Sequence, residues 1–241
     1  MSEHEHAHHE QPDEHGQAEA QDDGFTIWSV HRRGGPAANG GRAPLEKELA
    51  ALEAEGIIAR GIYDVSGMRA VADIMVWMHG TPGASAAPEA LQSAVRRVRR
   101  SRELAGTEQT WGAMGVHRDA EFNKSHVPGF MRGIEAKRWA TVYPFNRSYD
   151  WYLLPAEERS RMLAEHGRAG AAYRGIVANT VSAFALGDYE WILPLEADAL
   201  TDLVDMMRDL RSVDARLHVR EEIPFFTGRR IGADEIQEVL A

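Results

Sequence analysis

Two stretches of the sequence, Gly67-Met-Arg-Ala-Val-Ala-Asp-Ile-Met-Val-Trp77 and Gly187-Asp-Tyr-Glu-Trp-Ile-Leu193, share one pattern. Each places a turn glycine before a short apolar run that carries a tryptophan, which is typical of the second strand of a β-hairpin. The apolar runs at 57–65 and 177–186 precede these glycines, so each glycine is predicted to join a pair of strands. The same local structure is therefore expected twice in the chain.

Helical patterns flank both predicted strand pairs. Residues 42–55 carry leucines at 45, 49 and 52, which fall on one face of a helix, and residues 89–102 form a second amphipathic segment. A β-α-β-β-α-β order that occurs twice indicates an α+β fold of two ferredoxin-like repeats. Two such sheets would pack face to face, with the helices outside. The other expected elements are strands at 25–30, 140–144 and 215–222 and helices at 155–167 and 198–211.

Charge separates an N-terminal segment from the rest of the chain, which the repeated order of elements divides in two. Residues 1–24 contain eight acidic residues, no Lys or Arg and five of the 11 histidines. Because the net charge of the whole chain is −10, the remainder has a charge of only −10 − (−8) = −2. Residues 1–24 are predicted to be a disordered tail, whose histidines form either a weak Zn or Ni site or a solvated surface. Residues 25–135 and 136–241 are then the two ferredoxin-like halves.

Several classes of protein are excluded by what the sequence lacks. No apolar run approaches the roughly 20 residues needed to span a bilayer, and no signal-peptide pattern opens the chain. The nearly balanced charge beyond the tail argues against a nucleic-acid partner. With no cysteine, disulfides, thiolate metal sites and a cysteine nucleophile are all ruled out, and a cytoplasmic location is expected.

The segment from Pro155 to Gly167 offers a candidate metal ligand. His166 follows Met162 and Leu163 by four and three residues, so its imidazole shares their apolar helix face. A neutral imidazole on such a face is a good ligand for haem iron. The alternative is a core histidine that bonds a backbone carbonyl, and the helix by itself leaves both interpretations open.

The sequence just before this helix carries a specific resemblance. Tyr143-Pro-Phe-Asn-Arg147-Ser-Tyr-Asp-Trp151-Tyr-Leu-Leu-Pro155, followed by a helix that ends in His-Gly, resembles the actinobacterial coproheme decarboxylases of the chlorite dismutase superfamily. The resemblance covers roughly residues 25–232 and implies the chlorite dismutase fold, a dimeric α/β-barrel of two ferredoxin-like repeats. The other motifs that carry it are Glu121-Phe-Asn-Lys-Ser-His126, Ala178-Asn-Thr180, Gly187-Asp-Tyr-Glu-Trp191 and His218-Val-Arg-Glu-Glu-Ile-Pro-Phe-Phe-Thr-Gly228.

The resemblance implies a role for each matching residue. His166 corresponds to the proximal ligand of the iron, Tyr143 to a tyrosine that becomes a reactive radical, and His126 to a distal base that deprotonates hydrogen peroxide. The positions expected to contact the porphyrin are Arg147, Trp151, Asn179 and Arg216, with the two arginines as propionate anchors.

The implied activity is the hydrogen-peroxide-dependent decarboxylation of two propionates of Fe-coproporphyrin III (coproheme) to vinyls. The product is haem b, so the reaction is the last step of a haem biosynthesis route. The implied assembly is a homo-oligomer, a ring of five subunits, and ferrochelatase is an expected partner. Two alternatives stay open, a haem-binding carrier or sensor and a chlorite dismutase-like peroxidase. Asn179 argues against the latter, because chlorite dismutases carry an arginine 13 residues after the proximal histidine.

Overall fold

The first half of the chain forms one antiparallel repeat. The structure is a computed structural model that describes residues 23–35, 42–118 and 127–241. The predicted tail therefore lies outside the described residues, except for Asp23 and Gly24. The strand order β4-β1-β3-β2, with two helices on one face, is that of a ferredoxin-like repeat. Its elements are β1 (Thr26–Arg32), α1 (Leu45–Ala54), β2 (Ile57–Asp64), β3 (Ile74–Gly80), α2 (Pro88–Arg100) and β4 (Glu108–Gly115).

The second half repeats this topology. Its strands lie in the order β10-β5-β8-β6, so the first, third and last strands occupy the same places as in the first half. Two short strands, β6 and β7, replace a single second strand. The elements are β5 (Trp139–Arg147), η1 (Trp151–Leu153), α3 (Ala156–Ala171), β6 (Val177–Ala178), β7 (Val181–Ser182), β8 (Trp191–Ala197), α4 (Leu200–Asp209), η2 (Leu210–Ser212), η3 (Asp214–His218), β9 (Val219–Glu221), β10 (Phe226–Ile231) and α5 (Ile236–Val239).

The two repeats share one sheet that rolls into a barrel. Strand β10 pairs with both β2 and β5, so the ladder runs without a break from one repeat into the other. At the opposite side, Val116 and Ser182 exchange two backbone hydrogen bonds of 2.8 and 2.9 Å, which closes the barrel between β4 and β7. The predicted α+β fold of two ferredoxin-like repeats is confirmed, whereas two separate face-to-face sheets are replaced by one closed sheet.

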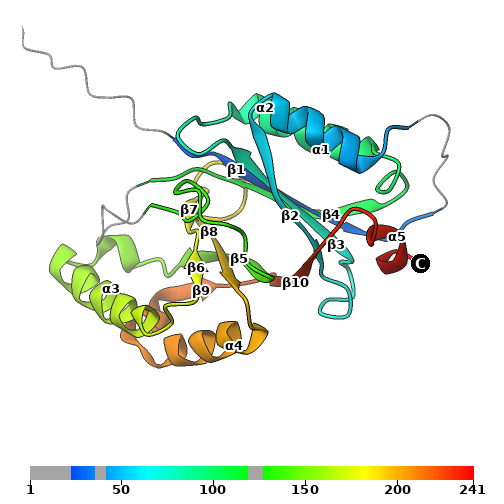
Figure 1. The fold of residues 1–241 in the computed structure, drawn as a ribbon. Helices are drawn as coiled ribbons and strands as arrows, with labels where there is room; N and C mark the ends of the chain where they lie inside the picture. The colour runs from blue at the N-terminus through cyan, green and yellow to red at the C-terminus, as the bar shows by residue number, and fades with distance from the viewer. Residues whose placement is uncertain (1–22, 36–41, 119–126) are drawn as a thin grey trace, which may run out of the picture.

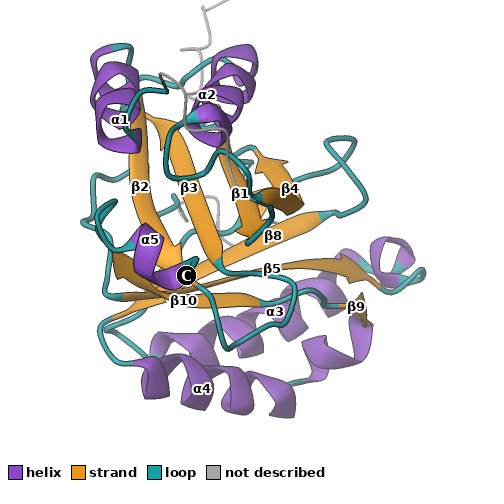
Figure 2. Cartoon of the chain, turned by 90° about the vertical axis from the view of Figure 1, so that its right-hand side faces the viewer, coloured by secondary structure: helices purple, strands orange, loops and turns teal. Residues whose placement is uncertain are grey.

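Three layers follow from the alternation of side chains along the strands. Trp28, Trp77, Tyr63 and Phe226 belong to the cluster that fills the barrel. Helices α1 and α2 cover the outside of the first repeat, and α3 and α4 lie outside the second (Figures 1 and 2). The filled barrel leaves the space between the second repeat and its helices as the place for a large ligand.

Two expectations about the elements are wrong, and two strands were missed. Helix α3 does not stop at Gly167 but continues to Ala171, because an interior glycine costs a helix only about 1 kcal/mol. Residues 214–218 form a 3₁₀ helix, so the predicted strand at 215–222 shortens to β9. Strands β4 and β10 were not expected from the sequence.

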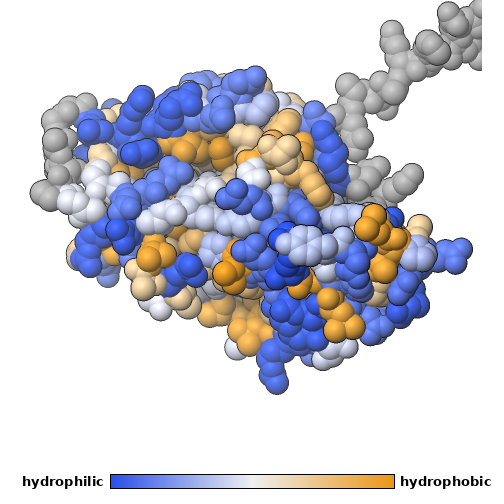
Figure 3. All heavy atoms as spheres, turned by 180° about the vertical axis from the view of Figure 1, so that it is seen from behind, coloured by the Kyte–Doolittle hydropathy of each residue, from blue (hydrophilic) through white to orange (hydrophobic). Residues whose placement is uncertain are grey.

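The outer surface is polar with scattered apolar positions. Figure 3 shows separate apolar patches among hydrophilic side chains on the face opposite to that of Figure 1. In the described parts of the chain, no helix is both long enough and apolar enough to cross a membrane.

Candidate functional site

Strand β5 directs alternate side chains to opposite sides of the sheet. Ala140 and Val142 belong to the cluster inside the barrel, whereas Tyr143, Phe145 and Arg147 face the helices. Because side chains alternate along a strand, Tyr143 and Arg147 of the sequence motif lie on the same face of the sheet. The motif is therefore a strand with a functional outer face.

Helix α3 forms the opposite wall of a cavity. Leu163, His166, Gly167 and Gly170 stand at positions i, i+3, i+4 and i+7 of one helix face, and all four line a cavity of about 490 Å³. A volume of this size is typical of a pocket for a small organic ligand. A smaller space of about 60 Å³ shares Tyr143, Arg147 and His166 with it and extends towards Arg216. Because the two glycines have no side chains, this face of the helix leaves room for the cavity.

His166 faces this cavity as a neutral imidazole. Burial, and secondly the positive charge of Arg147, lowers the pKa of the imidazole below its usual value of 6.5. The imidazole makes no hydrogen bond to any residue that the structure describes. Its ring nitrogens are therefore available to a ligand, and the alternative of a core histidine that bonds a backbone carbonyl does not fit.

One imidazole suits iron that a porphyrin already holds. Across the described ranges, no three His, Asp or Glu side chains converge to form a site for a bare metal ion. Porphyrin nitrogens occupy the equatorial positions of haem iron, so the protein needs to supply only an axial ligand. The cavity, His166 and the cationic residues around it fit an iron porphyrin with carboxylate side chains.

Tyr143 lies buried in the same cavity. Its ring stacks on Phe225 with 4.3 Å between ring centroids and 15° between ring planes. Its hydroxyl donates a hydrogen bond of 3.4 Å to the Sδ atom of Met207. Burial, reinforced by the carboxylate of Glu222, raises the pKa of the Tyr143 phenol far above its usual value, so the phenol stays protonated.

Arg147 and Trp151 form a stacked pair at the cavity wall. The Cζ atom of Arg147 lies 4.1 Å from the centroid of the Trp151 ring and 4.9 Å from that of Phe145. The two aromatic faces hold the plane of the guanidinium, a group whose planar fork matches the geometry of a carboxylate. Trp151 is almost fully buried, so it supports Arg147 and also packs the core beneath α3.

Arg216 is engaged in an ion-pair cluster beside the smaller space. Oε2 of Glu222 accepts a bond of 2.6 Å from Arg216 and one of 2.7 Å from Arg211. Glu222 is the one carboxylate among the described residues that line the two cavities, where Arg147, Arg174, Arg211 and Arg216 also lie. The cavity thus carries a net positive charge, which suits an anionic ligand.

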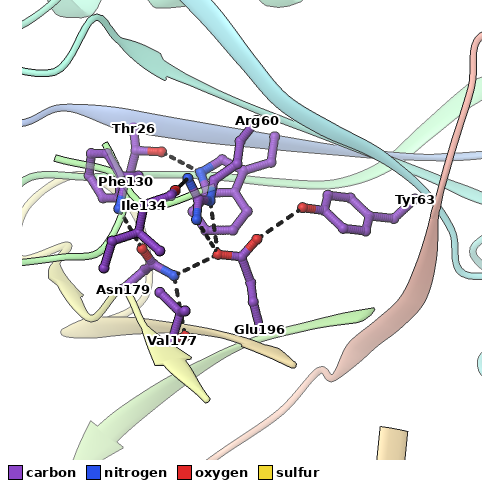
Figure 4. A network of polar contacts seen from close by, with 9 residues as sticks. Thr26, Arg60, Tyr63, Phe130, Ile134, Val177, Asn179 and Glu196 are labelled. Carbon is purple, nitrogen blue, oxygen red and sulfur yellow. Dashed lines mark hydrogen bonds and ion pairs between the residues drawn. The ribbon is translucent and has the colours of Figure 1, made fainter. Parts of the chain in front are cut away.

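Asn179 lies on the other side of the sheet from the cavity. Its neighbours Ala178 and Thr180 line the cavity, but its own amide donates to Glu196 (3.1 Å) and accepts from the Phe130 backbone (2.8 Å). Figure 4 shows Arg60, Tyr63 and Asn179 pointing towards the Glu196 carboxylate inside the barrel. The expected contact between Asn179 and the porphyrin does not fit this placement, because extended backbone turns alternate side chains away.

His126 lies outside the described residues, so its distance from Tyr143 and His166 is not defined. Several residues of the site were not singled out from the sequence, among them Met207, Arg211, Glu222 and Phe225. Glu222 and Phe225 belong to the motif that begins at His218, and this motif could have indicated them. Met207 and Arg211 show only ordinary helical spacing, which gives no signal of a site.

The chain is similar in sequence and in fold to known proteins. Residues 41–231 match the model of the chlorite dismutase family. A protein of Mycolicibacterium smegmatis described as a coproheme decarboxylase is 54% identical over 185 residues, which cover 76% of this chain and 78% of the relative. A Thermus thermophilus protein with the same description is 24% identical over 81% of both chains. The solved structure of the chlorite dismutase from Candidatus Nitrospira defluvii in complex with imidazole has a TM-score of 0.71 at 17% identity, covering 92% of this chain and 97% of that one.

Proposed function

The chain belongs to the chlorite dismutase family, and from that membership we propose that it is a coproheme decarboxylase of haem biosynthesis. The observation that carries the proposal is a single cavity in which the His166 imidazole, the Tyr143 phenol and the Arg147 guanidinium meet. The description of the M. smegmatis relative supports the same activity. The substrate is Fe-coproporphyrin III and the product is haem b.

His166 and the arginines would bind the substrate. The imidazole would be the ligand of the substrate iron, and its lowered pKa favours the neutral form that binds a metal. Arg147, fixed against Trp151, would bind one propionate in bidentate fashion. Arg216 would bind another once its contact with Glu222 rearranges. The small apolar side chains of α3 and β6 would contact the flat porphyrin faces.

The substrate iron supplies the redox chemistry with hydrogen peroxide. For each propionate, one carbon–carbon bond breaks, carbon dioxide leaves and a vinyl group forms. The propionate gives up two electrons, which reduce one peroxide to two waters with the uptake of one proton. No other cofactor is needed for this balance.

Tyr143 would remove the hydrogen atom from the propionate β-carbon. The phenol is buried, protonated and aligned by Phe225, so its electron and proton can leave together. His126 would act as the base that takes a proton from peroxide, a role that rests on the resemblance. A homo-oligomeric ring of five subunits, a ferrochelatase partner and a cytoplasmic location rest on the resemblance as well.

The test is to add iron coproporphyrin III to the purified protein, titrate hydrogen peroxide and follow the porphyrin by mass spectrometry. We expect a stepwise loss of two carbon dioxide units through a three-propionate intermediate. Tight binding followed only by bleaching would instead identify a carrier or sensor. Release of oxygen from added chlorite by the haem-loaded protein would identify a chlorite dismutase-like enzyme, and either result would overturn the proposal.

A further inference from the structure

The hydroxyl of Tyr143 has an unusual partner. Its hydrogen bond goes to the Sδ atom of Met207 on α4, at 3.4 Å, and no other described residue accepts from it. Glu222, a carboxylate that lines the same smaller space, is occupied by Arg211 and Arg216 at 2.7 and 2.6 Å. The phenol therefore points to a thioether although a carboxylate lies in the same part of the cavity.

A thioether differs from other acceptors because it cannot take the proton. Methionine sulfur is a weak acceptor that stays unprotonated at any pH the protein experiences. A carboxylate or imidazole in the same place could accept the proton when the phenol is oxidised, because both are stronger bases than a thioether. Sulfur fixes the direction of the hydroxyl while the proton remains on the tyrosine oxygen.

We propose that Met207 is a positioning residue for Tyr143, which orients the phenol hydroxyl through a weak, non-basic acceptor and so keeps the reacting hydrogen in place. Phe225 fixes the plane of the ring by stacking, and Met207 fixes the rotation of the hydroxyl about the C–O bond. The orientation of the phenol is thus set by residues from three parts of the chain: β5, α4 and the segment before β10. This inference rests on the proposed role of Tyr143 in decarboxylation.

Met207 could instead be simple packing, since methionine commonly fills irregular gaps. Met206 offers a matched control. It is the adjacent residue on α4 and also lines the cavity, but its sulfur makes no hydrogen bond to Tyr143. Leucine has nearly the volume of methionine and lacks the acceptor, so Met207→Leu and Met206→Leu separate the hydrogen bond from the packing.

The first measurement uses the porphyrin-free protein. Ultraviolet resonance Raman difference spectra against Tyr143→Phe isolate the bands of this phenol, whose C–O stretch reports its hydrogen bond. We expect Met207→Leu to shift this band and Met206→Leu to leave it in place. An unshifted band in Met207→Leu would show that the contact is absent in solution and would overturn the inference.

The second measurement is peroxide-dependent decarboxylation of bound coproheme. We expect kcat to fall about tenfold in Met207→Leu with KM nearly unchanged, in line with the loss of one hydrogen bond. Met207→Gln, which restores a neutral acceptor of similar length, should recover part of the rate. In the Tyr143→Phe background, Met207→Leu should have no further effect.

The outcomes are distinguishable. A shifted Raman band with an unchanged rate would show that the hydrogen bond does not affect the reaction and would overturn the positioning role. An equal fall of kcat in Met206→Leu would show that the loss of rate comes from packing, and would overturn it as well. If the wild-type protein binds coproheme but never decarboxylates it, the proposed function fails, and a positioning role in that reaction fails with it. The Raman comparison still decides whether the hydrogen bond exists.

Discussion

At the scale of single residues, the chemistry depends on one phenol and its surroundings. Tyr143→Phe removes only the hydroxyl, so the stack on Phe225 and the cavity shape persist. We expect coproheme binding within about twofold of wild type and decarboxylation reduced more than about 100-fold, a loss of roughly 2.7 kcal/mol in transition-state stabilisation. Binding is followed by optical titration and turnover by mass spectrometry. Tyr149→Phe, at an exposed tyrosine of the same motif, is the control. Full activity in Tyr143→Phe would contradict the proposed role.

The sequence indicated single residues only where a motif carried them. Tyr143, Arg147 and Trp151 lie in one continuous stretch, and the structure brings all three to the wall that faces His166. Asn179 was misassigned because the spacing along the chain does not tell which side of a strand a residue faces. Met207 could not be found from the sequence, because its role depends on how α4 packs against β5.

At the scale of the elements, helix α3 determines how much space the porphyrin has. A Cβ atom at Gly170 would meet only the Cε atom of Met206, at an ordinary distance of 3.7 Å. We expect Gly170→Ala to raise the free energy of unfolding by about 0.5–1 kcal/mol, because alanine is the better helix former. Gly170→Leu should fill the cavity and weaken coproheme binding more than about tenfold. Urea unfolding and optical titration measure the two effects, with Ala164→Leu on the exposed face of the helix as control. Undiminished binding in Gly170→Leu would place the porphyrin elsewhere.

Two buried histidines in strands β1 and β3 make the stability depend on pH. Burial lowers the pKa of His31 and of His79 from 6.5 to about 4. Between these values the unfolded chain takes up protons that the native chain does not, so stability is lost as the pH falls below 6.5. From pH 7 to pH 5 we expect a loss of about 2 kcal/mol for each histidine.

Urea unfolding at several pH values measures this loss. His31→Asn and His79→Asn should each have a shallower pH profile than the wild type, whatever their stability at pH 7. Equal slopes in the wild type and both variants would show that these histidines are protonated in the native state.

The order of elements could be predicted from hydrophobic periodicity, but their exact ends could not. Turn glycines between apolar runs predict the strand pairs at 57–80 and 177–197. Both ferredoxin-like repeats could be predicted from these strand pairs and the helices around them. Strand β4 is half exposed and lacks an apolar run, and β10 contains two adjacent arginines, so neither shows the usual alternation. Their place in the sheet depends on pairing with distant strands, which local pattern does not contain.

At the scale of the whole molecule, a buried ion pair joins the two repeats. Arg60 on β2 donates to Glu196 on β8 through Nε at 2.9 Å and Nη2 at 2.5 Å, and both side chains are almost completely buried. Removal of one partner leaves a charge inside the barrel without compensation. We expect Arg60→Met to lower the free energy of unfolding by about 3–5 kcal/mol, and Arg60→Met with Glu196→Gln to recover part of the loss.

Chemical denaturation measures these changes, with Arg97→Met as the surface control. Arg97 pairs with Glu55 on the outside of the first repeat, where an ion pair is worth less than about 1 kcal/mol. A similar small loss in Arg60→Met would mean that water reaches the pair inside the barrel.

The way the barrel closes determines where it can open locally. The two repeats share a continuous ladder at β2 and β10, whereas on the opposite side of the barrel the isolated bridge between Val116 and Ser182, with its two backbone hydrogen bonds, joins β4 to β7. The ladder is longer than the isolated bridge, so we expect the barrel to open first at the bridge between Val116 and Ser182, while each repeat keeps its own helices. The backbone amides of Val116 and Ser182 should therefore exchange with deuterium early, and those in the ladder between β2 and β10 should exchange late.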